Sequence, residues 1–347
     1  MDHSMSEDRD QGVQSPAGED SKTRATVLVA LGANLVIAAA KAVGGLFAGS
    51  PALLSEAAHS VADSLNEIFL LAAVKRSKRA PDAEHPFGYG KERFFWSLLA
   101  AVGIFVMGGC FSFFQGIEAL RSHESESHNG YVVGLCVLFV ALMAEGASLV
   151  KALWQVRERA RRTGRSMSAE IRAAQDPALR TVLAEDSTAC LGVTLAIVGM
   201  GLHMATGSVV WEAWASIAIG VLLVYVAYTL GRDARKVLIG EAADPVLQRA
   251  VRDFLTSQPE IDTVTALLTM RLGTDAVLIA ARVDLVGGLD SEEVEEVAVR
   301  IKGELRERWP QAQEIFLDIT DASDEDRVRS MHEGKALDRE VSRLRAD

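Results

Sequence analysis

The sequence predicts an α-helical membrane protein: a bundle of six transmembrane helices followed by a small cytoplasmic domain of α/β type. Three observations support this prediction. First, 49% of the 347 residues are hydrophobic, and the mean hydropathy of +0.15 is high for a soluble chain of this length. Second, apolar runs of helical length recur before residue 236. Third, most of the net charge of −11 lies after residue 241, so charge separates a membrane part from a soluble part.

The apolar runs each come close to the ~20 residues that a helix needs to cross the hydrocarbon core. They lie at about 25–47, 52–74, 94–118, 131–154, 180–204 and 209–231. Lys and Arg cluster after the second, fourth and sixth runs, whereas the loops of the opposite side contain only Arg121. The positive-inside rule therefore places both termini in the cytoplasm, and we expect residues 25–236 to form the transmembrane domain.

Residues 1–24 are acidic and polar and contain no apolar core. We therefore expect neither a signal peptide nor a transit peptide here, but a disordered segment. The three cysteines, Cys110, Cys136 and Cys190, each lie in an apolar run and outside any C-x-x-C pair. We interpret them as small core side chains, not as disulfide partners or thiolate metal ligands. The acidic balance also argues against a nucleic-acid partner.

The second run, 52–74, carries Glu56, His59, Asp63 and Glu67 at spacings of three and four residues. On a helix this spacing places them on one face, turn above turn. An ionisable group inside a membrane costs several kcal/mol unless it faces a partner, a cavity or an ion. An imidazole and a carboxylate one turn apart can bind the same divalent cation, and this mixture of nitrogen and oxygen suits zinc or a neighbouring transition metal. The pattern predicts a path for a metal ion.

Other polar residues in the apolar runs have alternative explanations. Asn34 is either a weak oxygen ligand or part of a helix-to-helix hydrogen bond. Lys41 lies near the outer end of its run, where a lysine can extend its amine to the membrane surface. Glu145 should face the bundle interior, either as a proton-binding group or as a structural partner of another span. The polar loop 121–130 is either a collecting site for metal or a flexible connection.

Two motifs together resemble the cation diffusion facilitator family of metal-ion/proton antiporters. One is the pair His59-x-x-x-Asp63, and the other is the loop 82–91, which reads Asp-Ala-Glu-His-Pro-Phe-Gly-Tyr-Gly-Lys. The resemblance covers about residues 25–320 and implies six spans, cytoplasmic termini and efflux driven by proton entry. The direction of transport is not visible in the residues themselves.

The resemblance also implies metal ligands in the fifth run. Asp186 matches an Asp of the family pattern, whereas Val182 stands where a His is common. Glu185 is the natural substitute as a ligand. Adjacent helical residues, however, point about 100° apart, so Glu185 and Asp186 can bind the same ion only if the helix is distorted or Glu185 reaches around it. In the alternative interpretation, Glu185 contacts a neighbouring helix or transfers protons. The predicted ligand set is His59, Asp63 and Asp186, with Glu185 and, more weakly, Asn34.

The loop 82–91 offers a second, weaker candidate site. Asp82 and His85 match an accessory metal site of the family, but Tyr89 stands where a second His is common. The alternative is a purely structural loop.

Residues 241–320 have the pattern of a small soluble domain. Helices are predicted at 244–257 and 290–308, and strands at 262–271, 276–285 and 313–319, in the order α-β-β-α-β. This order implies a sheet with one helical face, and the resemblance implies a metallochaperone-like dimerisation module. The domain contains no histidine, so we do not expect zinc at the dimer interface. The charged tail 321–347 is predicted to be either a solvated helix or disordered.

The predicted function is efflux of a divalent cation, zinc first, by proton-coupled antiport with alternating access. Zinc is then the transported substrate and no resident cofactor is expected; the partners are protons, the lipid bilayer and a second copy of the chain. We expect a secondary transporter and not an enzyme, in a bacterial inner membrane. The alternatives are an exporter of Mn²⁺, Fe²⁺ or Co²⁺, and a non-transporting, metal-sensing membrane scaffold.

Overall fold

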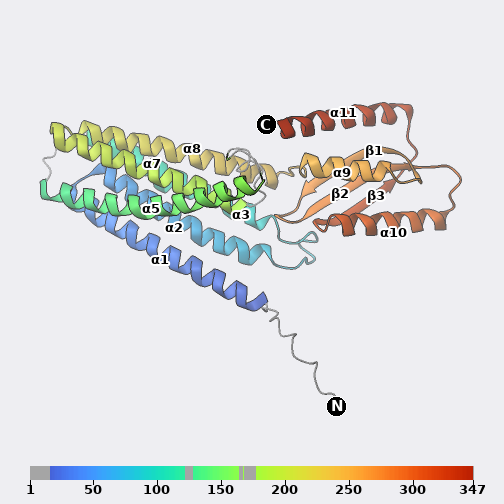
Figure 1. Ribbon diagram of the computed structural model, residues 1–347, viewed down its shortest axis with the longest axis horizontal. Helices are drawn as coiled ribbons and strands as arrows, with labels where there is room; N and C mark the ends of the chain where they lie inside the picture. The colour runs from blue at the N-terminus through green and yellow to red at the C-terminus, as the bar shows by residue number, and fades with distance from the viewer. Residues whose placement is uncertain (1–15, 122–127, 164–166, 168–176, 347) are drawn as a thin grey trace, which may run out of the picture.

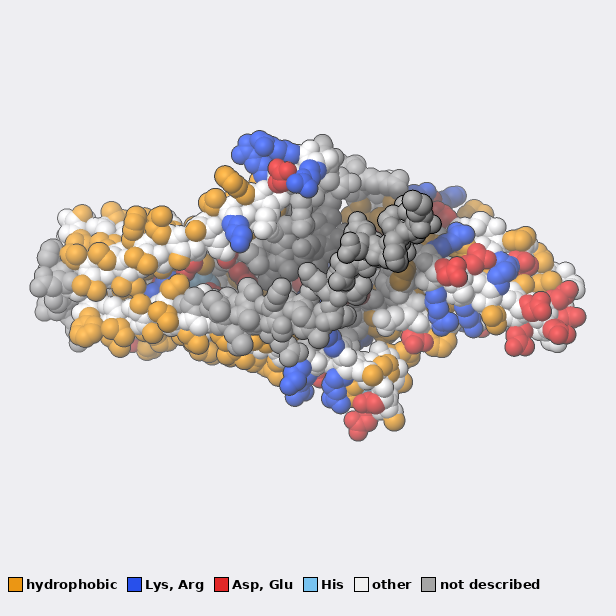
Figure 2. Space-filling model, turned by 60° about the horizontal axis from the view of Figure 1, so that its bottom comes forward, with side chains coloured by type: hydrophobic (Ala, Val, Ile, Leu, Met, Phe, Trp, Pro, Cys, Tyr) orange, Lys and Arg blue, Asp and Glu red, His pale blue; other side chains and the backbone are white. Residues whose placement is uncertain are grey.

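The computed structural model describes residues 16–121, 128–163, 167 and 177–346. A long helical bundle forms one end of the molecule and a small domain with a three-stranded sheet forms the other (Figure 1). Figure 2 shows hydrophobic side chains over the surface of the bundle, and charged side chains towards the end that holds the sheet. This division confirms the predicted fold class of a helical membrane part and a small α/β part.

The bundle consists mainly of long helices. Their bounds are α1 Pro16–Ala48, α2 Pro51–Ser77, α3 Glu92–Gly103, α4 Phe111–Arg121, α5 His128–Thr163, α7 Pro177–Thr206 and α8 Val210–Leu238. A π-helical segment, Ile104–Cys110, joins α3 and α4 into one continuous rod. Helix α2 packs against α1, α3, α4, α7 and α8, so it lies inside the bundle.

Within the described residues, four stretches are long and apolar enough to cross a membrane by length and composition. They are Glu92–Arg121, Gly130–Arg162, Leu183–Thr206 and Val210–Leu238. The described apolar stretch of α1, Asn34–Ala48, is shorter. Helix α2 does not qualify because its charged stripe lowers its hydropathy. Both α1 and α2 nevertheless pack within the same bundle, as the expected arrangement of six spans requires.

The turn between α1 and α2 follows from its residues. Gly49 has a φ of 66°, a conformation that costs glycine little. Ser50 then caps α2 by accepting a hydrogen bond from the amide of Leu53, and Pro51 occupies the first helical position, where its missing N–H is not needed. Helices α1 and α2 are thereby held antiparallel and in contact.

The small domain confirms the predicted order α-β-β-α-β. Its elements are α9 Pro245–Thr256, β1 Ile261–Arg271, β2 Val277–Leu285, α10 Ser291–Arg308 and β3 Ala312–Ile319. The sheet has the order β1-β2-β3, with β1 antiparallel and β3 parallel to β2. Leu255, Ile279, Ile301 and Leu305 are among the buried core residues. The connection from β2 to the parallel β3 runs through α10, as a parallel pair requires.

Both ends of the described chain are helical, which differs from the expectation for the first residues and agrees with one of the two alternatives for the tail. Helix α1 begins at Pro16, before the end of the segment 1–24 that was expected to be disordered; residues 1–15 lie outside the described part. The charged tail is a helix, α11 Asp324–Ala346. Arg327 of this helix donates hydrogen bonds to Asp262 at 2.5 Å and Asp284 at 2.8 Å, so α11 is docked on β1 and β2 by ion pairs.

The cysteines behave only partly as expected. All three are free thiols, but Cys110 and Cys136 are exposed on the outer surface of the bundle and Cys190 is half-buried. The interpretation of Cys110 and Cys136 as core side chains is therefore wrong. In a membrane bundle an apolar run faces lipid as readily as protein, and hydropathy does not distinguish the two faces.

Candidate metal site

The predicted stripe on α2 faces the bundle interior near His59. The His59 side chain is 5% exposed, and its Nε2 lies 3.6 Å from Asp63 Oδ2, one helical turn away. Neither ring nitrogen of His59 has a hydrogen-bond partner within the part of the chain that the structure describes. A buried imidazole with two unused nitrogens is rare, and it leaves a lone pair available for an ion.

Glu185 and Asp186 on α7 point to different neighbours. Glu185 Oε1 accepts a hydrogen bond of 2.6 Å from Asn66 Nδ2 on α2, whereas Asp186 Oδ2 accepts one of 2.6 Å from Ser148 Oγ on α5. This divergence is the ~100° rotation between adjacent helical residues. Asp63 of the α2 stripe interacts electrostatically with both Glu185 and Asp186. The side chain of Val182 lies outside the described residues.

Asn34 belongs to a helix-to-helix contact. Its Nδ2 donates a hydrogen bond of 2.7 Å to Glu67 Oε1, which joins α1 to α2. This contact corresponds to the hydrogen-bond interpretation of Asn34. It also engages one oxygen of Glu67, the last acid of the stripe.

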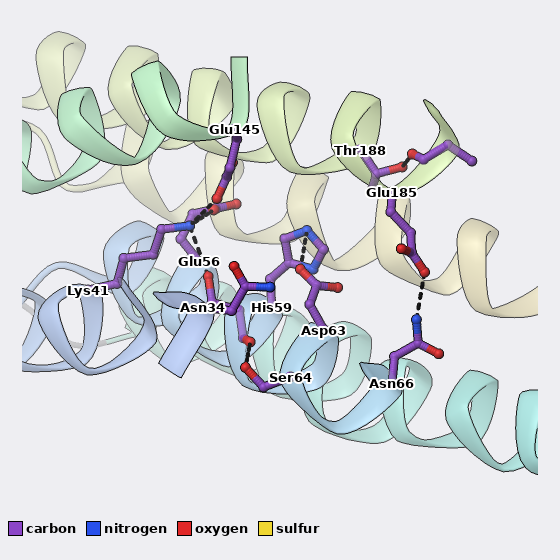
Figure 3. Close-up of polar contacts among 12 residues, drawn as sticks. Asn34, Lys41, Glu56, His59, Asp63, Ser64, Asn66, Glu145, Glu185 and Thr188 are labelled. Atoms are coloured by element: carbon purple, nitrogen blue, oxygen red, sulfur yellow. Dashed lines mark hydrogen bonds and ion pairs between the residues drawn. The ribbon is translucent and has the colours of Figure 1, made fainter. Parts of the chain in front are cut away.

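The candidate ligands share one region of the bundle without forming a closed coordination shell. Figure 3 shows three polar groups in a row along α2: Lys41 with Glu56 and Glu145, then His59 with Asp63, then Asn66 with Glu185. Among the described residues, no three His, Cys, Asp or Glu side chains are close enough together to hold a metal ion. The structure therefore brings His59 and Asp63 together and leaves Glu185 and Asp186 on hydrogen-bond donors.

Lys41 does not extend to the membrane surface, so that prediction is wrong. The side chain is fully buried, and its Nζ donates hydrogen bonds to Glu56 at 3.0 Å, Ser60 at 3.0 Å and Glu145 at 3.1 Å. For Glu145, this contact is the structural partnership that was one of its two interpretations. A hydropathy profile does not show which helices share an ion pair. The presence of Lys41, Glu56 and Glu145 in apolar runs was nevertheless a signal that each has a partner inside the bundle.

A second buried polar cluster, which the sequence analysis missed, lies where α7 meets α8. Glu212 is fully buried; it accepts a short hydrogen bond from Ser50 Oγ, and its Oε1 lies 2.6 Å from Nδ1 of His203. The same ring nitrogen is 3.1 Å from the hydroxyl of Tyr131. This cluster ties α5, α7 and α8 to the cap of α2 at the end of the bundle away from the sheet.

The loop 82–91 is held together by its own residues. Asp82 accepts hydrogen bonds from the Tyr89 hydroxyl at 2.5 Å and from the backbone amides of His85 and Glu84 at 2.8 and 3.1 Å. The rings of His85 and Tyr89 are 4.3 Å apart, and the Arg79 guanidinium lies 4.3 Å from the centre of the Tyr89 ring. Both carboxylate oxygens of Asp82 are thus engaged. This geometry supports the structural interpretation of the loop.

Replacing Tyr89 with phenylalanine is expected to raise the pKa of the Asp82 carboxyl. The Tyr89 hydrogen bond, followed by the backbone donors, holds this pKa below the ordinary value of 3.8. A depressed carboxyl pKa stabilises the fold above the ordinary pKa, and the stabilisation is lost as pH falls through the lowered pKa. The measurement is a ¹³C NMR titration of Asp-labelled protein. Tyr225→Phe on exposed α8 is the control, and an unshifted Asp82 in Tyr89→Phe would contradict the prediction.

Comparisons with known proteins agree on the class of this chain. A family model described as the cation efflux transmembrane domain matches residues 27–239. The proton-coupled zinc antiporter SLC30A9, mitochondrial, of Xenopus laevis is 32% identical over 247 residues, which cover 71% of this chain and 44% of that protein. The manganese efflux system protein MneP of Bacillus subtilis is 25% identical over 302 residues, 86% of this chain and 95% of that protein. The chain thus spans less than half the length of the zinc antiporter.

Proposed function

This chain belongs to the cation diffusion facilitator family, and on that premise we propose that it exports a divalent metal cation, zinc first, in exchange for protons. It is an integral membrane protein, and its relatives are named as antiporters and efflux proteins. The observation that supports the proposal most is His59: a buried imidazole with two unused nitrogens, one turn from Asp63, on a helix enclosed by the bundle.

In the proposed mechanism, His59 and Asp63 contribute the first ligands and α7 contributes the rest. Glu185 would leave Asn66, and Asp186 would leave Ser148, to complete the shell around the ion. Each of these exchanges replaces one hydrogen bond with one metal–oxygen contact, so a small movement of α7 against α2 would switch between them. Metal ligands must be deprotonated to bind. Protons therefore compete with the ion for the same groups.

The choice of metal follows from the ligand chemistry. One nitrogen and up to three carboxylates accommodate zinc, but a set so rich in oxygen also accommodates Mn²⁺, Fe²⁺ or Co²⁺. Relatives are named for both zinc and manganese. We therefore propose zinc as the transported ion, with Mn²⁺, Fe²⁺ and Co²⁺ as alternatives.

Introducing a histidine at Val182 is expected to increase the preference for zinc over manganese by about tenfold, because zinc gains more than manganese from a second imidazole. The measurement is a competition between the two ions for flux into proteoliposomes. Val198→His, at an exposed position of the same helix, is the matched control. An unchanged zinc-to-manganese ratio in Val182→His would mean that this part of α7 does not line the ion site.

The assembly and location are proposed as well. We propose that the α-β-β-α-β domain is a dimerisation module. The expected oligomeric state of the chain is a homodimer without zinc at its interface. Cytoplasmic termini in a bacterial inner membrane remain the proposed arrangement; the zinc antiporters that the chain resembles are named as mitochondrial.

A non-transporting metal sensor is the second candidate function. It is favoured by the open arrangement of the ligands, since no three of them gather among the described residues. Proteoliposomes containing the purified chain and a pH-sensitive dye separate the two candidates. A transporter acidifies or alkalinises the lumen in step with zinc movement, whereas a sensor binds zinc and moves neither ion.

A further inference from the structure

A cluster of charged residues lies next to the candidate metal site, with Lys41 at its centre (Figure 3). We call Lys41, Glu56, Ser60 and Glu145 the Lys41 cluster. The ammonium group of Lys41 touches one oxygen of each of the other three, at 3.0 to 3.1 Å. Lys41 and Glu56 are 0% exposed and the Glu145 side chain is 17% exposed. Three helices, α1, α2 and α5, thus enclose one cation with oxygen atoms.

The Lys41 cluster borders the candidate metal site on the same helix. Glu56 precedes His59 by three residues, so the two lie on one face of α2. Asp63 interacts electrostatically with Lys41 and with Glu56, and Glu145 interacts with His59. An ion at His59 and Asp63 would therefore have two further carboxylates nearby.

Each carboxylate of the Lys41 cluster has one oxygen that makes no hydrogen bond among the described residues. Glu56 Oε1 and Glu145 Oε2 are buried and have no hydrogen-bond partner within the described chain. Glu56 Oε1 faces Gly192 on α7, where a Cβ atom would collide with it. The glycine at position 192 thus leaves room for the Glu56 carboxylate. Four carboxylate oxygens and a hydroxyl form the kind of donor set that hard cations such as Mn²⁺ and Ca²⁺ prefer.

We propose that the Lys41 ammonium is a resident cation: it fills a second, oxygen-lined cation position beside the transport site and keeps Glu56 and Glu145 out of reach of the transported ion. This inference rests on the proposed function and deepens it, because it names Lys41 as a determinant of metal selectivity. With Lys41 in place, the ion meets one imidazole and the carboxylates of Asp63 and α7. Without it, the ion also meets a site made of oxygen alone.

The charge balance explains why the position would not remain empty. Two carboxylates and one ammonium give the cluster a net charge of −1. Removing the ammonium leaves two buried carboxylates that require either a cation or protons, because an uncompensated buried charge is costly. A divalent cation neutralises both at once. Substitution of Lys41 is therefore expected to create a binding site for a hard cation.

The test counts Mn²⁺ ions bound by the purified full-length chain in detergent, by equilibrium dialysis at neutral pH. Lys41→Met is expected to bind about one ion more per chain than the native protein, because an all-oxygen position is now vacant. Lys41→Arg keeps the cation and should bind as the native protein does. The triple variant Lys41→Met, Glu56→Gln, Glu145→Gln removes the oxygen site and should lose the additional ion.

A charge-matched variant covers the case in which Lys41→Met does not fold. Lys41→Met with Glu145→Gln has the same net cluster charge of −1 as the native chain and retains Glu56 and Ser60. It should bind the additional Mn²⁺ more weakly than Lys41→Met and more tightly than the triple variant. An additional ion in either folded variant supports the proposal. The absence of an additional ion from both Lys41→Met and Lys41→Met with Glu145→Gln, or from whichever of the two folds, up to millimolar Mn²⁺, overturns it.

Combination with His59→Ala separates this inference from the proposed function. His59→Ala should remove the first ion from both the native chain and Lys41→Met, and leave the additional ion of Lys41→Met in place. If His59→Ala leaves the number of Mn²⁺ ions bound by the native chain unchanged, the transport site is misassigned. The role proposed for Lys41 is then still decided by whether Lys41→Met binds the additional ion.

Discussion

Replacement of His59 by alanine lowers zinc flux into proteoliposomes by at least about 100-fold, since changes in the surroundings of metal ligands alone cost 10–100-fold in affinity or activity. The imidazole is the nitrogen donor of the predicted site, and it is buried in the bundle. The loss should be in transport and not in folding, because neither ring nitrogen supports a hydrogen bond among the described residues. The measurement is the initial rate of zinc uptake at fixed protein-to-lipid ratio.

His332→Ala is the matched control for this prediction. His332 lies on the exposed surface of α11, where its Nδ1 is 2.9 Å from the backbone carbonyl of Val328 four residues earlier, so its removal should leave flux within about twofold of native. A His59→Ala variant that transports zinc at the native rate would show that the imidazole is a packing residue.

Replacement of Lys41 by methionine destabilises the bundle by about 3–5 kcal/mol, the typical cost of removing one partner of a buried ion pair. The change leaves two carboxylates, Glu56 and Glu145, without their shared cation in the interior of three packed helices. The measurement is reversible unfolding in mixed micelles without divalent cations. A metal ion in the buffer would refill the position and mask the loss through its binding energy.

Lys151→Met removes an exposed lysine from α5 and serves as the control, with an expected change within about 0.5 kcal/mol. If Lys41→Met and Lys151→Met unfold alike, the Lys41 ion pairs contribute nothing to stability.

Much of the fold could be predicted because it depends on local patterns. The apolar runs, the Ser50-Pro51 turn and the α-β-β-α-β order each follow from periodicity, capping and turn residues within a short stretch of chain. The stripe on α2 could be predicted for the same reason, since residues three and four apart share a helical face. The divergence of Glu185 and Asp186 follows from helix geometry as well.

The partners of the buried charges could not be predicted, because they depend on how distant helices pack. Lys41 and Glu145 are 104 residues apart in the chain, and nothing local to either residue indicates the other. The same holds for Ser50 and Glu212, which are 162 residues apart. Hydropathy places such residues at a depth in the membrane and gives no information on which helix they face.

The central claim is that His59 and carboxylates from α2 and α7 bind the same ion. X-ray absorption at the zinc edge, on the chain loaded with one zinc per molecule, tests it most directly. The account predicts nitrogen and oxygen ligands at about 2.0–2.2 Å with the outer-shell scattering of a single imidazole, and loss of that imidazole signal in His59→Ala. An imidazole signal that persists in His59→Ala, or a native spectrum without one, would contradict the account.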